Sequence, residues 1–222
     1  MTISFENKVV IVTGSGGGLG RCHALQFAQR GAKLVINDLG GAVDGSGGSS
    51  EAADKVVQEI KDMGGEAISN GSSVTDKEGV QKLVDDAMSA YGRIDVLVNN
   101  AGVLRDKSFA KVTLDDFEFV VDVHLMGSVY CSKAVWPIMV EQQYGRIIMT
   151  SSSSGVFGNF GQANYGSAKL GVVGLMNTLR IEGQKNNIKV NSLIPVAATR
   201  MTENLGMPEE VLKQLKPEST SD

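Results

Sequence analysis

The chain has 222 residues, of which 42% are hydrophobic and 21% are charged, and its formal net charge is −4. This length fits one domain, and the apolar fraction can supply a large core. An acidic chain without a basic run excludes a typical nucleic-acid-binding protein, and no apolar run reaches the ~18 residues that span a bilayer. With no signal peptide in view, we expect a soluble intracellular protein with no membrane partner; the cytoplasm is favoured, and a peroxisomal location stays open.

Strand and helix signals alternate along the chain. Short apolar runs predict strands at 9–12, 34–36, 66–69, 96–98, 146–150 and 188–194. Helices are predicted at 19–30, 51–63, 76–91, 114–142 and 165–185, with Gly127 and Pro137 as weak points of the fourth. This alternation predicts an α/β fold, a Rossmann-type doubly wound parallel sheet, formed as a single domain over residues 1–222. A Gly/Ser-rich segment at about 40–50 reads as a surface insertion, and about 198–222 as a weakly structured tail.

Polar or conformationally special residues follow five of the six predicted strands. These residues are Gly14, Asp38, Asn99, Ser152 and Pro195. Ligands of such sheets bind beyond the carboxyl ends of the strands. The sequence therefore predicts a ligand cleft at that edge.

A glycine-rich loop, T-G-S-G-G-G-L-G, runs from Thr13 to Gly20. It follows a predicted strand and opens a predicted helix, which is the context that distinguishes a dinucleotide loop from an ordinary turn. Glycines let the backbone approach a pyrophosphate, and the helix N-terminus attracts its charge. We therefore expect this loop to bind a dinucleotide.

Two further segments extend that prediction. Asp38 ends the second strand, where a carboxylate accepts hydrogen bonds from ribose hydroxyls and repels a 2′-phosphate, which favours NAD over NADP. The alternative is a turn or helix-capping aspartate. The run N-N-A-G at 99–102 ends a buried strand. Its side-chain amides can tie the loop to neighbouring strands or line the cofactor groove, and the alternative is a simple turn.

Tyr165 and Lys169 are four residues apart in a predicted helix, so their side chains share a face. An ammonium about 5 Å from the phenol, at an effective dielectric of ~20, favours the phenolate by roughly 3 kcal/mol and lowers the tyrosine pKa by ~2.4 units. The tyrosine would then exchange a proton with an alcohol or carbonyl. Ser152 can hold the substrate oxygen by a hydrogen bond. Taken alone, the pair also fits an ordinary solvated helix pair.

The remaining reactive side chains are few. Cys22 and Cys131 both lie in predicted helices, which favours buried thiols over a disulfide or a nucleophile. His23 and His124 are too few, without a matching ligand cluster, to predict a metal site. We expect no metal.

The glycine loop, N-N-A-G, the upstream serine and Y-x-x-x-K, in this order, resemble the short-chain dehydrogenase/reductase family over Lys8 to about Met201. The resemblance implies that Ser152 positions the substrate oxygen, that Tyr165 is the acid/base and that Lys169 holds the nicotinamide ribose. It also implies a set of other cofactor-binding residues: Gly14, Gly18, Leu19, Gly20, Val74, Asn100, Ala101, Gly102, Ile194, Pro195 and Thr199.

Longer strings narrow the match. N-D-L-G-G with its insertion, V-L-R-D-K-S-F, Y-G-R-I-I-M-T-S-S and G-N-F-G-Q-A-N-Y resemble the (3R)-hydroxyacyl-CoA dehydrogenase units of multifunctional β-oxidation enzymes. This resemblance implies NAD-linked oxidation of a 3-hydroxyacyl-CoA, in a homodimer or homotetramer. His124 stands where the wider family often has an asparagine that holds a proton-relay water, and the narrower group tends to share the histidine, so His124 is a catalytic candidate.

Two departures keep alternatives open. Ser72-Ser73-Val74 offers hydroxyls where the family usually has an aspartate facing the adenine. The chain ends at Asp222, whereas family members usually continue through a further helix and a seventh strand, so we expect the usual final strand to be lacking. A dehydrogenase acting on another alcohol or ketone (a steroid, a sugar or an acyl carrier thioester) and an NAD-binding, catalytically weak assembly module both remain possible.

Overall fold

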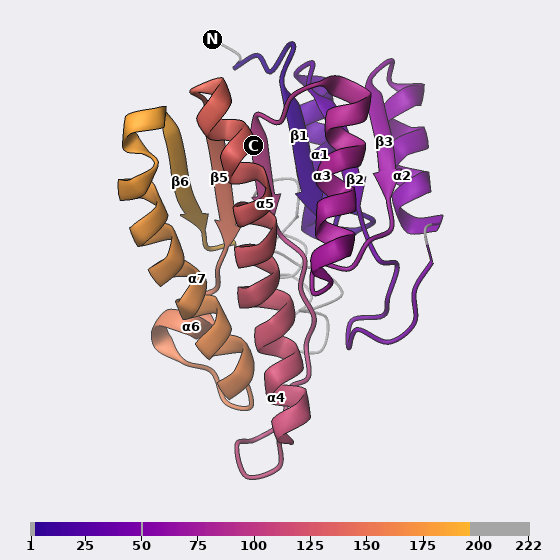
Figure 1. Ribbon diagram of the computed structural model, residues 1–222. Coiled ribbons are helices and arrows are strands. Elements are labelled where there is room, and N and C mark those ends of the chain that lie inside the picture. Colours follow the sequence, from indigo (N-terminus) through magenta and orange to yellow (C-terminus); the bar gives the residue numbers. More distant parts are fainter. Residues whose placement is uncertain (1–2, 50, 196–222) are drawn as a thin grey trace.

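A computed structural model describes residues 3–49 and 51–195 (Figure 1). Its centre is a parallel sheet in the order β3-β2-β1-β4-β5-β6. The strands are β1 (Val9–Thr13), β2 (Lys33–Asn37), β3 (Glu66–Asn70), β4 (Val96–Asn99), β5 (Gly145–Thr150) and β6 (Ile188–Leu193). This order confirms the predicted doubly wound sheet, while Thr199 and the predicted tail at 198–222 lie outside the described residues.

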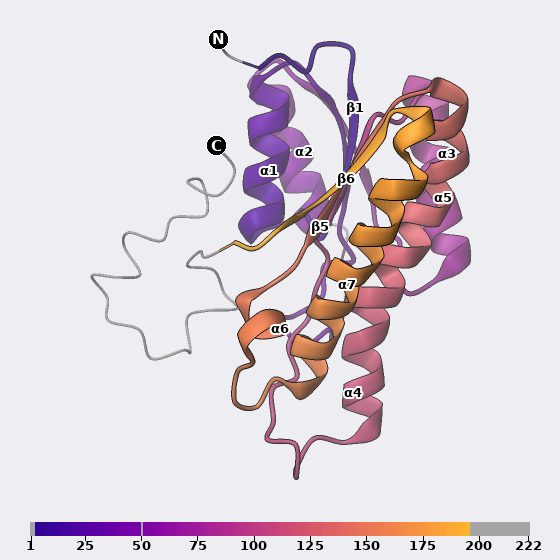
Figure 2. The same cartoon turned by 90° about the vertical axis from the view of Figure 1, so that its left-hand side faces the viewer.

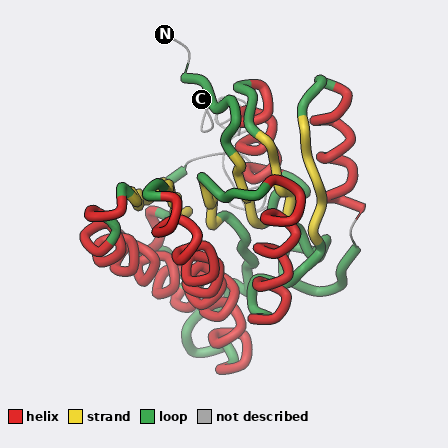
Figure 3. Tube along the Cα trace, turned by 45° about the horizontal axis from the view of Figure 1, so that its top comes forward, coloured by secondary structure: helices red, strands yellow, loops and turns green. Residues whose placement is uncertain are grey.

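Helices cover both faces of the sheet (Figure 3). They are α1 (Gly18–Gln29), α2 (Glu51–Asp62), α3 (Lys77–Tyr91), α4 (Leu114–Val121), α5 (Gly127–Gln142), α6 (Ser153–Phe157) and α7 (Ala163–Glu182). Figure 2 shows α1 and α2 on one face, with α3, α5 and α7 on the other. All strand arrows in Figure 1 point to the same edge, so the loops that follow them gather there.

The strands are apolar without alternation because both of their faces are covered. In β1, Val10 and Val12 belong to the core under α1 and α2, whereas Ile11 belongs to the core under α3, α5 and α7. All three side chains are 0% exposed. Cys131 on α5 is buried in the second of these cores. Successive residues of a strand point to opposite faces, so one short apolar run supplies both cores.

The predicted helix at 114–142 is interrupted just before Gly127, one of its two predicted weak points. A π-helical turn, Asp122–Met126, separates α4 from α5, and the α-helix resumes at Gly127. Pro137 lies inside α5 without ending it. The π turn shifts the side-chain register, and it places His124 in the interior with 3% of its surface exposed.

Helix α6 escaped the sequence pattern because five residues are too few to show a helical period. Ser152 caps it, accepting a hydrogen bond at its hydroxyl from the Ser154 backbone N–H at 3.2 Å. The cap holds Ser152 at the carboxyl end of β5, facing the loop edge of the sheet.

Candidate active site

A cleft of about 710 Å³ lies at the carboxyl ends of the strands, a size typical of ligand pockets. Most of the predicted site residues line it: Gly14, Gly18, Leu19, Gly20, Asp38, Val74, Asn100, Ala101, Gly102, His124, Ser152, Tyr165, Lys169 and Pro195. Ile194 is not among the lining residues and is 46% exposed. The residues predicted to follow the strands therefore surround one space, and they come from all six strand ends.

The glycine loop is held open by the N-N-A-G segment. The Asn100 side-chain amide donates to the backbone carbonyls of Thr13 and Gly14, both at 2.9 Å. The Thr13 hydroxyl accepts from the backbone N–H groups of Asn100 and Ala101, both at 3.0 Å. A Cβ on Gly20 would lie 2.3 Å from the Gly14 carbonyl oxygen, so no side chain fits there. The bare loop at the start of α1 thus suits a pyrophosphate.

Asp38 organises two loops at once. Its Oδ2 accepts from the Gly16 N–H and its Oδ1 from the Gly40 N–H, each at 2.7 Å. The contact with Gly40, two residues on, is a turn hydrogen bond, so the turn alternative is present in the structure. A carboxylate has about four acceptor positions, so two stay available for a ribose diol. Ribose binding by Asp38 remains a prediction.

Ser152, Tyr165 and Lys169 approach one another from two helices. Tyr165 and Lys169 lie near the start of α7, and the Lys169 Nζ is 5.5 Å from the centre of the Tyr165 ring. The same Nζ donates to the Thr150 carbonyl at 2.6 Å. The Ser151 hydroxyl donates to the Lys169 carbonyl at 2.7 Å, which fixes the end of β5 against α7.

The expected lowering of the tyrosine pKa is wrong for this structure. Burial raises the pKa of Tyr165 above its usual value, a hydrogen bond with the Ser152 side chain opposes this, and the charge of Asp106 adds to the rise. Burial also lowers the pKa of Lys169, to about 7. The lysine is thus only partly charged at neutral pH and its ammonium points to the Thr150 carbonyl, so it does little to favour a phenolate.

His124 packs against Tyr165. Its ring meets the Tyr165 ring edge to face, with centres 5.0 Å apart and planes at 90°. Its Nε2 lies 2.8 Å from the Val103 carbonyl and 3.1 Å from the Val103 N–H. Burial, together with the charge of Lys169, holds the pKa of His124 well below its usual range. The imidazole is therefore neutral at pH 7, and its buried Nδ1 has no partner among the described residues.

Several cleft residues were missed by sequence reasoning. Thr150 is 8% exposed, and its hydroxyl has no partner in the described part of the chain. Gln162 is 7% exposed and donates from its amide to the Asp106 carboxylate at 2.7 Å. The position of Thr150 at the end of a predicted strand was the available signal. Gln162 carried none, because its contact joins segments 56 residues apart.

Residues 3–49 and 51–195 contain neither a cluster of potential metal ligands nor a helix that could span a membrane. No group of three or more His, Cys, Asp or Glu side chains there could hold a metal ion. None of the helices in these ranges is both long and apolar enough to cross a membrane.

Comparisons with known proteins agree with this geometry. A sequence profile described as short chain dehydrogenase matches residues 8–210. The chain is 55% identical over 218 residues to peroxisomal multifunctional enzyme A of Dictyostelium discoideum, covering 98% of this chain and 48% of that protein. It is 55% identical over 216 residues to peroxisomal multifunctional enzyme type 2 of Mus musculus, covering 97% and 29% respectively. The chain thus spans less than half the length of these curated relatives.

Two solved structures share the fold. Full-length peroxisomal multifunctional enzyme type 2 from Drosophila melanogaster superposes with a TM-score of 0.79 at 42% identity, covering 99% of this chain and 35% of that chain. A 7α-hydroxysteroid dehydrogenase complexed with NADH and 7-oxo glycochenodeoxycholic acid superposes with a TM-score of 0.88 at 28% identity, covering 98% and 86%. Together with the profile match, these likenesses confirm the resemblance stated from sequence, and the chain belongs to the short chain dehydrogenase family.

Proposed function

We propose that this chain uses NAD to oxidise the 3-hydroxyl group of a (3R)-3-hydroxyacyl-CoA, giving the 3-oxoacyl-CoA. The observation that carries the proposal is that Ser152, Tyr165 and Lys169 line the same cleft as the bare glycine loop. The substrate class is supported by the 55% identity to peroxisomal multifunctional enzymes.

The cleft fits a nicotinamide dinucleotide. Gly20 lets the start of α1 pack closely against the Gly14 carbonyl and the Asn100 side chain, and Asp38 keeps acceptor positions for a ribose diol. Pro195 lines the other side of the cleft, beyond β6. A family member at 28% identity was solved with NADH, which supports the same cofactor class here. When bound, NAD supplies the hydride acceptor.

Side chains of the protein then accept the proton of the substrate hydroxyl. Ser152 holds the substrate oxygen, and Tyr165 takes the hydroxyl proton at its phenol oxygen. Because burial raises the pKa of Tyr165, the phenol is protonated at neutral pH and must lose its proton before it can act as a base. We therefore expect the rate of alcohol oxidation to rise with pH through the neutral and alkaline range. Lys169 would hold the nicotinamide ribose, while neutral His124 keeps the tyrosine ring in place.

The test is NADH formation from (3R)- and (3S)-3-hydroxyacyl-CoA by the purified chain. Turnover with the (3R) thioester alone is expected. Tyr165→Phe should lower turnover by about 10²- to 10⁴-fold, since it removes the proton-transfer group, and should leave NAD binding intact. Equal rates in wild type and variant would disprove the role of Tyr165.

One observation favours a second candidate. The 7α-hydroxysteroid dehydrogenase has the TM-score of 0.88 given above, so a different secondary alcohol, such as a steroid, a sugar or an acyl carrier thioester, fits the same fold. A substrate panel separates these enzymes. An NAD-binding assembly module would instead bind NAD and turn over none of the panel.

Assembly and location form part of the proposal. Leu170 and Ile181 on α7 are 49% and 61% exposed, which supports pairing of α7 in a homodimer or homotetramer. Light scattering on the purified chain would measure its mass. The peroxisomal names of the relatives support a peroxisomal location over the cytoplasmic one expected from sequence. Imaging of a tagged chain tests this.

A further inference from the structure

The predicted surface insertion has an ordered course in the structure. Residues 39–46, here called the strap, leave the end of β2, and residues 47–49 return toward α2. The Ser49 N–H donates to the Leu39 carbonyl at 2.9 Å and closes the base of the loop. The Ala42 N–H donates to the Ser46 carbonyl at 2.8 Å and closes its tip. A glycine-rich segment thus adopts one defined shape.

The tip of the strap is docked onto the segment that follows β4. The Leu104 N–H donates to the Val43 carbonyl at 2.9 Å, and the Arg105 Nε donates to the Asp44 carbonyl at 3.0 Å. Strand β1 lies between β2 and β4 in the sheet. The strap therefore spans the interval beyond β1, where the glycine loop begins.

Arg105 connects the tip of the strap to the start of α7. Its guanidinium lies 4.0 Å from the centre of the Phe119 ring and pairs with Asp116 at 2.9 Å. Its carbonyl accepts from the Asn164 side-chain amide at 3.1 Å. The Asn164 side-chain oxygen in turn accepts from the Tyr165 N–H at 2.8 Å. The strap and the start of α7 are thus fixed to the same residue.

The strap also forms one wall of the cleft, to which it contributes Leu39, Gly41, Ala42, Val43 and Gly45. We propose that the strap is a functional part of the dinucleotide-binding site, that Arg105 is a positioning residue that docks it, and that the docked strap slows release of the nucleotide. The inference rests on the proposed function, because it takes NAD as the ligand of this cleft.

Two glycines of the loop give a matched pair of variants. Gly45 and Gly47 both have positive φ, 85° and 73°, so alanine costs similar backbone strain at each. A Cβ at Gly45 would lie 2.7 Å from the Phe119 ring, whereas a Cβ at Gly47 would meet nothing within 4 Å. Gly47 also lies outside the set of residues that line the cleft. Only Gly45→Ala should therefore push the strap off its dock.

The experiment measures the NADH dissociation rate by stopped-flow fluorescence and the NADH Kd by titration, with urea unfolding as a check on folding. Gly45→Ala should raise both the rate and the Kd by about 10-fold, equal to ~1.4 kcal/mol, and Gly47→Ala should leave both near wild type. Adding Phe119→Leu to Gly45→Ala removes the collision and should restore most of the retention.

The outcomes separate the two proposals. If the wild-type chain binds NADH and the two glycine variants release it equally fast, the strap inference is wrong while the proposed function stands. If the double variant releases NADH as fast as Gly45→Ala, collision with Phe119 does not displace the strap, and the strap inference is wrong. A wild-type chain that binds no NADH overturns both proposals.

Discussion

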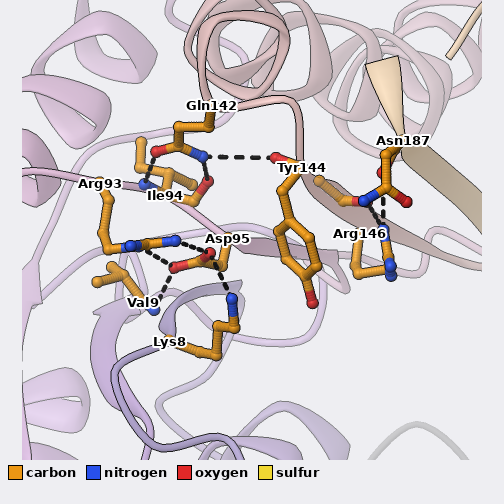
Figure 4. A network of polar contacts seen from close by, with 10 residues as sticks. Lys8, Val9, Arg93, Ile94, Asp95, Gln142, Tyr144, Arg146 and Asn187 are labelled. Atoms are coloured by element: carbon orange, nitrogen blue, oxygen red, sulfur yellow. Dashed lines mark hydrogen bonds and ion pairs between the residues drawn. The ribbon is translucent and has the colours of Figure 1, made fainter. Parts of the chain in front are cut away.

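The two edges of the sheet differ in how fully their buried polar groups are hydrogen-bonded. At the amino edge, Asp95 is 0% exposed and is surrounded by donors: Arg93 contacts both carboxylate oxygens at 2.7 Å, the Val9 N–H donates at 3.0 Å and the Lys8 ammonium at 3.3 Å (Figure 4). At the carboxyl edge, buried polar atoms of His124 and Thr150 have no partner in the described ranges. One edge is complete by itself, and the other leaves hydrogen-bonding capacity for a ligand.

The amino edge holds further polar contacts besides those of Asp95. The Tyr144 ring has the Lys8 ammonium 4.0 Å and the Arg146 guanidinium 4.3 Å from its centre. The Gln142 amide accepts from the Ile94 N–H at 3.0 Å and donates to the Ile94 carbonyl at 2.7 Å (Figure 4). A buried polar group without a partner costs free energy, so such pairing supports the fold. The amino edge of the sheet therefore contributes to stability, while the carboxyl edge holds the candidate active site.

The largest effect is expected at Lys169, the buried cation of the carboxyl edge. Burial lowers its pKa to about 7, against ~10.4 for an unfolded chain. Between these values the unfolded state binds more protons, so this group costs stability below pH 7 and the cost disappears as pH rises toward 10. The unfolding free energy of wild type should therefore rise by about 4 kcal/mol relative to Lys169→Met over this range. Urea unfolding at several pH values measures it, and parallel pH curves would contradict it.

The next effect concerns the amino edge. Asp95→Asn should lower the unfolding free energy by about 3 kcal/mol, because it leaves the Arg93 and Lys8 cations without a counter-charge. Burial acts to raise the pKa of Asp95, but bonds from Arg93 and the Val9 N–H and the charges of Lys8 and Arg93 outweigh it, so the net shift is downward. The advantage of wild type over the variant should therefore be full above pH 4 and be lost as pH falls below it.

A control for Asp95 is the exposed pair of Lys33 and Glu66, 3.1 Å apart with side chains 35% and 61% exposed. Glu66→Gln should cost about 0.5 kcal/mol or less, since water screens the pair. Similar losses in Glu66→Gln and Asp95→Asn would show that burial of the carboxylate adds nothing.

Two polar-to-apolar substitutions, one at each edge of the sheet, should change the unfolding free energy by smaller amounts. Gln142→Met should cost about 1–2 kcal/mol, because it leaves both backbone groups of Ile94 unpaired. Thr150→Val should stabilise the chain by up to about 1 kcal/mol, because the Thr150 hydroxyl has no partner among the described residues. Chemical denaturation of both variants without NAD gives the two signs, and equal signs would remove the contrast between the edges.

The sequence allowed the strands and the position of the cleft to be predicted because both depend on local signals. The run at 9–12 is apolar without alternation, and a parallel sheet then brings every strand end to one edge. The pKa of Tyr165 could not be predicted, because it depends on burial and on Asp106, which no local pattern reveals. Asp95 was missed for a similar reason: a single acidic residue before a strand has no pattern of its own.

Backbone details were harder still. The π turn at Asp122–Met126 reflects a shift in hydrogen bonding that the composition does not record, although Gly127 marked its end. The strap was predicted only as flexible surface, because glycine and serine content says nothing of docking onto Arg105. These features of the structure depend on contacts between segments that are distant in sequence, and a local sequence pattern does not record such contacts.

Cys131 offers a way to time the opening of this molecule. It is 2% exposed in the core beneath α5, and burial raises the pKa of its thiol to about 12. Alkylating reagents attack the thiolate, of which only about one part in 10⁵ exists at pH 7 with such a pKa. In a Cys22→Ser background, the alkylation rate of Cys131 would thus measure how often α5 separates from the sheet. Comparing that rate with and without nucleotide would show whether ligand binding at the carboxyl edge stabilises the packing of α5.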